Sequence, residues 1–66
     1  MITLAEQIAE VQRELALRRK LYPQWIKRNK LDAGEAKHQM RCLEAVLKTL
    51  ELVDFAQRQL PLFPPA

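Results

Sequence analysis

The sequence predicts an all-α protein, an antiparallel hairpin of two helices. The chain has 66 residues, of which 48% are apolar and 29% are charged, a balance typical of a globular domain. A single glycine and few aromatic residues exclude a β-sandwich or barrel, which would need many more turn residues and β-branched runs. Two segments carry apolar residues at helical spacing, and a helix-capping pattern precedes each of them.

The first helix is expected to begin after Thr3. Thr3 and Glu6 fit the capping box, in which the threonine hydroxyl accepts from an early backbone N–H and the glutamate reaches back to the threonine N–H. Pro23 removes one helical hydrogen bond and disfavours helical geometry at the residue before it, so we expect a kink or break near residues 21–23. The apolar stripe of this helix comprises Leu4, Ile8, Val11 and Leu15, and it continues through Arg18, Tyr22 and Trp25.

The second helix is expected to run over residues 33–58. Asp32 can cap its start, with Glu35 three positions further on, and residues 29–31 then form the connection. The apolar stripe of this helix comprises Ala36, Met40, Leu43, Leu47 and Leu50, and Val46 and Val53 widen it.

The chain therefore divides into a helical hairpin, residues 1–58, and an extended C-terminal peptide tail, residues 59–66. Pro61 ends the helix, and the two further prolines of the tail favour extended geometry. Two helices alone bury little apolar surface. For a chain of this size, we therefore expect a homodimer in which two hairpins form a helical bundle.

Positive charge is concentrated near the predicted turn. Residues 1–17 carry three acids and one arginine, a net charge of −2, whereas residues 18–30 carry six bases and no acid. Such a cluster can bind a phosphate backbone, and aromatic residues within it can stack on bases. Tyr22 and Trp25 continue the apolar stripe, however, which favours a place in the core. The candidate nucleic-acid contacts, with DNA as the partner, are Arg18, Arg19, Lys20, Lys27, Arg28 and Lys30.

The tail carries a five-residue pattern, QLPLF, over residues 59–63. It resembles the short peptide by which bacterial proteins bind the sliding clamp of DNA polymerase, whose pattern is Gln, Leu, a small or acidic residue, Leu and Phe. Proline at the third position departs from that pattern but is compatible with an extended peptide. The resemblance implies clamp binding through Gln59, Leu60, Leu62 and Phe63. In the alternative, the apolar side chains of the tail fold back and close the open end of the hairpin.

The helical segments carry a second, looser resemblance. They are similar to small uncharacterised proteins encoded by phages and prophages, which implies the setting of a short accessory or host-takeover protein but no activity. The matching stretches are residues 9–15, 21–26 and 44–50.

The sequence offers little chemistry for an enzyme. It contains no catalytic triad, no catalytic pair of carboxylates and no glycine-rich phosphate loop, so we expect no catalysis and no cofactor. His38 and Cys42 are four residues apart, but two ligands do not make a zinc site, and we expect a partly buried Cys42 and no metal. A single cysteine, with no signal peptide and no apolar run of ~20 residues, favours a cytoplasmic protein without membrane contact.

These observations predict a small non-enzymatic interaction protein that binds the sliding clamp and modulates replication or repair. Two alternatives remain. One is a nucleic-acid-binding hairpin that uses residues 18–30, and the other is a structural dimeric adaptor without clamp contact, similar to the plasmid copy-number hairpins that form four-helix bundles.

Overall fold

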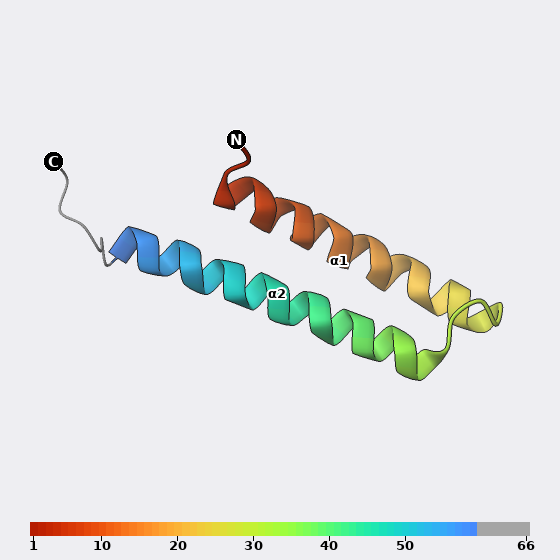
Figure 1. The fold of residues 1–66 in the computed structure, drawn as a ribbon. Helices are drawn as coiled ribbons and strands as arrows, with labels where there is room; N and C mark the ends of the chain where they lie inside the picture. The colour runs from red at the N-terminus through yellow and green to blue at the C-terminus, as the bar shows by residue number, and fades with distance from the viewer. Residues whose placement is uncertain (60–66) are drawn as a thin grey trace, which may run out of the picture.

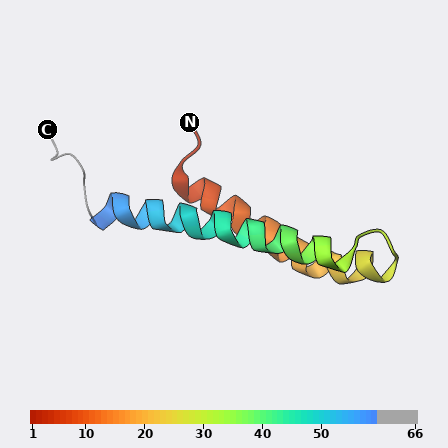
Figure 2. The same cartoon turned by 60° about the horizontal axis from the view of Figure 1, so that its bottom comes forward.

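The computed structural model describes residues 1–59 and confirms the all-α hairpin. Helix α1 spans Leu4–Lys27 and helix α2 spans Ala33–Gln59, and the two run antiparallel along each other (Figure 1). In Figure 2 the helices overlap near the turn and separate towards their free ends. Both chain ends of the described part therefore lie opposite the turn.

The start of α1 confirms the predicted capping box. The Thr3 hydroxyl accepts from the backbone N–H of Glu6 at 3.1 Å, and the Glu6 carboxylate accepts from the backbone N–H of Thr3 at 3.3 Å. Two of the four N–H groups that a helix start leaves without a partner are thereby satisfied.

Helix α1 continues through Pro23 without a break. Of the two outcomes expected there, the break does not occur, because the helix packs against α2 on both sides of the proline. Tyr22 is buried and Ile26 is half-buried, and both line a groove shared with Ala36 and Met40 of α2. These contacts offset the loss of the one hydrogen bond that Pro23 cannot donate.

The end of α1 is a Schellman motif. The N–H of Asn29 donates to the carbonyl of Ile26 at 3.0 Å, and the N–H of Lys30 donates to the carbonyl of Trp25 at 2.8 Å. Asn29 has a φ of 58°, in the left-handed region that asparagine tolerates better than most residues. This motif reverses the chain within the predicted connection.

Helix α2 starts at the predicted cap. The Asp32 carboxylate accepts from the N–H of Glu35 at 3.0 Å, and the Asp32 carbonyl accepts from the N–H of Ala36 at 2.9 Å. Its last helical residue is Gln59, one position beyond the predicted end.

The core of this hairpin is thin. Only Leu15, Tyr22 and Ala36 are buried within the described residues, and the remaining members of both stripes are mostly half-buried. Val46 and Val53 were expected to widen the buried stripe of α2, but they are exposed, because a single partner helix covers only the centre of that stripe. The exposed large apolar residues are Met1, Ile2, Leu17, Trp25, Val46, Leu52, Val53 and Phe55.

Candidate functional site

The structure gathers most of the basic segment at the turn end of the hairpin. Arg19, Lys20 and Lys27 are exposed on α1, Arg28 is its C-cap, and Lys30 is exposed in the turn. These five cations are accessible to a polyanion. The sixth predicted contact, Arg18, is not equivalent to them.

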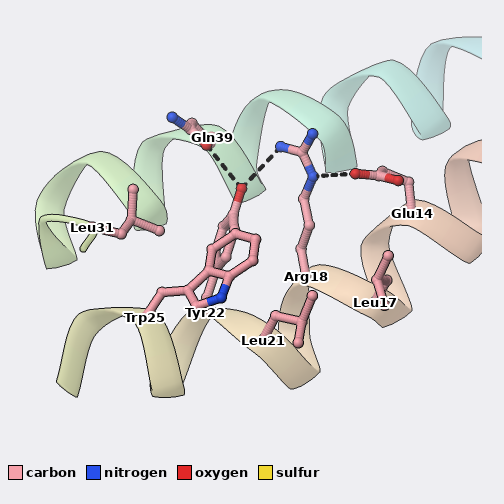
Figure 3. A pocket seen from close by; sticks show the side chains of 8 residues that line it. All are labelled: Glu14, Leu17, Arg18, Leu21, Tyr22, Trp25, Leu31 and Gln39. Carbon is pink, nitrogen blue, oxygen red and sulfur yellow. Dashed lines mark hydrogen bonds and ion pairs between the residues drawn. The ribbon is translucent and has the colours of Figure 1, made fainter. Parts of the chain in front are cut away.

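Arg18 belongs to a hydrogen-bonded network that links the two helices (Figure 3). Its Nε donates to Glu14 at 2.6 Å, and its Nη1 donates to the Tyr22 hydroxyl at 2.9 Å. The Tyr22 hydroxyl in turn donates to Oε1 of Gln39 on α2 at 2.8 Å. The hydrogen bond to Glu14 raises the pKa of Arg18. Arg18 is therefore a structural residue, and its prediction as a nucleic-acid contact is not favoured by the geometry.

The two aromatic residues of the basic segment differ in exposure. Tyr22 is 6% exposed, which confirms its predicted place in the core. Trp25 is 38% exposed, because Ile26 rather than Trp25 continues the inward stripe. The two rings lie with centroids 5.7 Å apart and planes inclined by 41°. Only Trp25 is thus accessible to a ligand.

Two residues of α2, Lys37 and Gln39, lie beside this segment although no sequence pattern connects them with it. Lys37 lines the same groove as Arg19, which extends the positive surface from α1 onto α2. Gln39 accepts the hydrogen bond of the Tyr22 hydroxyl. The buried position predicted for Tyr22 already implied such a partner, because a buried hydroxyl usually finds one.

Of the predicted clamp-binding residues, the structure describes Gln59, which lies at the opposite end of the hairpin from the turn. Gln59 is exposed and is the last residue of α2, whereas Leu60, Leu62 and Phe63 lie outside the described residues. Leu52 and Phe55 are each 61% exposed, and the steps from Leu52 to Phe55 and from Phe55 to Gln59 are three and four residues. This spacing places all three on one side of α2.

No metal centre is formed by residues 1–59. The Sγ of Cys42 lies 3.5 Å from Nε2 of His38, but no group of three His, Cys, Asp or Glu side chains could hold an ion. Cys42 is exposed, so its predicted partial burial is wrong: its position in the helix turns it away from α1. In the part of the chain that the structure describes, neither helix is long and apolar enough to cross a membrane.

Comparison with known proteins finds no matching family, no similar curated protein and no similar solved structure.

Proposed function

We propose that this chain is a non-enzymatic interaction protein that binds the sliding clamp of bacterial DNA polymerase through residues 59–63. The observation that carries the proposal is the position of Gln59, the first motif residue. Helix α2 ends at Gln59, the first motif residue, at the end of the hairpin where α1 and α2 have separated. Gln59 itself is exposed, so the described part of the motif is accessible to a partner.

The exposed side of α2 just before the motif supports this proposal. Leu52 and Phe55 lie on the same side of the helix as Gln59, and α1 covers neither of them. A partner that holds the motif could therefore also contact these two side chains. We expect Phe55→Ala to weaken clamp binding several-fold, with an unchanged helical spectrum.

The residue types of the motif fit an apolar pocket with a polar rim. Burial of Leu62 and Phe63 would each contribute about 1.5–3 kcal/mol before the cost of ordering the peptide. The Gln59 amide offers two donors and an acceptor that can fix the register of the peptide. An anchor of this size corresponds to a dissociation constant on the order of micromolar.

Such binding acts by occupancy of the clamp. The chain would either compete with polymerases for the clamp or recruit another factor to it, in a short phage-type accessory protein acting in the cytoplasm. In both cases the hairpin serves as the body that presents the motif.

The test is binding of the purified full chain to a bacterial sliding clamp, beside a chain truncated after Arg58. The truncation removes the motif and keeps all but the last residue of α2. Circular dichroism of both forms establishes that the hairpin is intact. We expect micromolar binding by the full chain and none by the truncated chain, whereas equal behaviour of the two forms would exclude the motif as the contact.

A second candidate function is nucleic-acid binding by the turn end. The exposed cations Arg19, Lys20 and Lys27 favour it, with Lys37 of α2 beside Arg19. The 27 residues of α2 separate this surface from Gln59 by about 40 Å, so the two functions can be tested independently. Neutralising one cation that binds a phosphate should reduce the slope of log K against log salt by about 0.9 for duplex DNA.

A further inference from the structure

One broad side of the hairpin carries a line of residues on α1 that α2 leaves open. Gln7, Glu10, Glu14, Leu17 and Leu21 follow one another at spacings of three and four, and all of them line the two grooves on this side. Such spacing places them on a single side of the helix. We call this side of the hairpin the open face.

The turn half of the open face is a groove lined by an apolar cluster. Leu17 is 45% exposed and Trp25 is 38% exposed, and the half-buried Leu21 and Leu31 lie beside them (Figure 3). The polar network of Arg18 and Tyr22 borders this cluster on the α2 side.

The other half of the open face is a groove between the separating helices. Its apolar walls come from Ile2, Val11, Val46 and Leu50, and it encloses about 570 Å³. Glu6, Gln7 and Glu10 of α1 complete its lining. An apolar groove of this size is large enough for an indole ring.

We propose that the open face packs against the open face of a second copy of this chain, with the two α1 helices antiparallel. Trp25 of each copy then enters the groove of the other. Residues 7–11 line that groove on α1, so the two-fold axis crosses α1 halfway between them and Trp25, close to Leu17. Each contact occurs twice, as an isologous interface requires.

The charge distribution favours this direction. Glu6 and Glu10 border the groove, whereas Trp25 lies within the basic segment of residues 18–30, and Arg18 lines the same pocket as Trp25. An antiparallel pair brings the net charge of −2 of residues 1–17 against the +6 of residues 18–30 in the other copy. A parallel pair would instead place the two basic segments side by side, which like charges oppose.

The exposed apolar side chains also favour a dimer. Four of them lie on the open face, with exposed fractions of 68% for Ile2, 46% for Val46, 45% for Leu17 and 38% for Trp25. A standard interface buries about 800 Å² per partner, of which about two thirds is apolar in homodimers. Burial of these four side chains against a second copy would contribute to the apolar part of such an interface.

The proposed register places the single cysteine near the two-fold axis. Tyr22 of α1 contacts Gln39 of α2, so five residues back on α1 corresponds to about five residues forward on α2. The level of Leu17 on α1 is thus that of Glu44 on α2, two residues from Cys42. Cys42 follows Gln39 and precedes Val46 at spacings of three and four, which places it on the same side of α2 as these two groove residues. We expect the two exposed Cys42 thiols of a dimer to lie close together.

The test is the molar mass of the full chain by sedimentation equilibrium, with Trp25→Glu as the variant and Phe55→Glu as the control. Phe55 is exposed but lies off the open face. For the wild type and the control, we expect a molar mass twice the 7.7 kDa of the chain. For the Trp25 variant, we expect the dimer dissociation constant to rise by about 30-fold or more. Helical spectra of all three forms exclude unfolding as the cause.

Cross-linking adds a readout of the register. Mild oxidation with diamide, which takes up the two electrons and two protons of a thiol pair, should join two wild-type chains through Cys42 but not the Trp25→Glu chains. A monomeric wild type would overturn the proposal. A full chain that stays monomeric while the chain truncated after Arg58 dimerises would also overturn it, because the tail of the same chain would then occupy the groove. A dimer that Trp25→Glu leaves intact would overturn it as well.

Discussion

Within residues 1–59, the Tyr22 hydroxyl joins the two helices through a side-chain hydrogen bond to Gln39, and its removal gives a direct test of the core. It accepts from Arg18 on its own helix and donates to Gln39 on α2, at 2.9 and 2.8 Å. Tyr22→Phe removes both bonds and keeps the ring, which is 6% exposed. Gln39 is half-buried and loses its donor, whereas Arg18 keeps its bond to Glu14.

The expected cost follows from these two bonds. A typical intramolecular hydrogen bond contributes about 0.5–1.5 kcal/mol, and water can replace part of what the half-buried groups lose. We therefore expect Tyr22→Phe to lower the free energy of unfolding by about 1–2 kcal/mol. For a hairpin whose core supplies only about 3–5 kcal/mol, this is a large fraction of the stability. It corresponds to a decrease in Tm of at least about 4 °C.

The assay is thermal and urea unfolding followed by circular dichroism at a fixed protein concentration. A double-mutant cycle with Gln39→Ala isolates the bond between the helices, and we expect a coupling energy of about 0.5–1.5 kcal/mol. A Tyr22→Phe chain as stable as the wild type, or a coupling energy near zero, would refute the assignment of this network as the link between α1 and α2.

Three further predictions concern stability. Leu15→Ala should lower the free energy of unfolding by about 2–5 kcal/mol, because Leu15 is 2% exposed. The control Leu52→Ala, at a 61% exposed position, should change it by less than about 0.5 kcal/mol. Similar urea midpoints for the two variants would contradict the burial of Leu15. Asp32→Ala should cost about 0.5–2 kcal/mol through loss of the α2 cap, and an unchanged Tm would exclude that role. The hydrogen bond from Arg13 lowers the pKa of Glu10 below its usual 4.5, so this exposed pair stabilises the fold above pH 4.5 and its small contribution is lost as the pH falls through the lowered pKa. Glu10→Gln should accordingly reduce stability at neutral pH but not in strong acid, well below the lowered pKa, and an equal loss under both conditions would contradict the sign.

The features that local sequence fixes were predictable. Thr3 and Glu6, like Asp32 and Glu35, are three residues apart, and their capping bonds depend only on the residues between them. The same holds for the pair of Glu14 and Arg18. Helix boundaries followed from these caps, because a cap fixes where helical geometry begins irrespective of what the helix later packs against.

The features that depend on packing against the second helix could not be predicted from the sequence as well. The spacing of Trp25 continues the inward stripe, yet Ile26 takes the inward position and leaves the indole exposed. Helical spacing drifts around the axis, so the last turn of a long stripe is assigned poorly. The bond from Tyr22 to Gln39 spans 17 residues, and no local pattern identifies its acceptor. Pro23 remains helical for the same reason, since packing on α2 outweighs the local preference for a break.

The two proposed surfaces have a combined geometric consequence. An antiparallel pair of open faces would place the two Gln59 residues at opposite ends of the dimer. Both motifs would then be available at once, and avidity would arise only if two clamp sites match their separation.

The central claim, that the motif occupies the clamp's peptide site, is tested most directly by competition. A fluorescent clamp-binding peptide is bound to the purified sliding clamp and titrated with the full chain or with a chain carrying Leu62→Ala and Phe63→Ala. We predict displacement at micromolar concentrations by the wild-type chain and none by the double variant. Clamp binding without displacement of the peptide, or displacement that the double variant reproduces, would contradict the account.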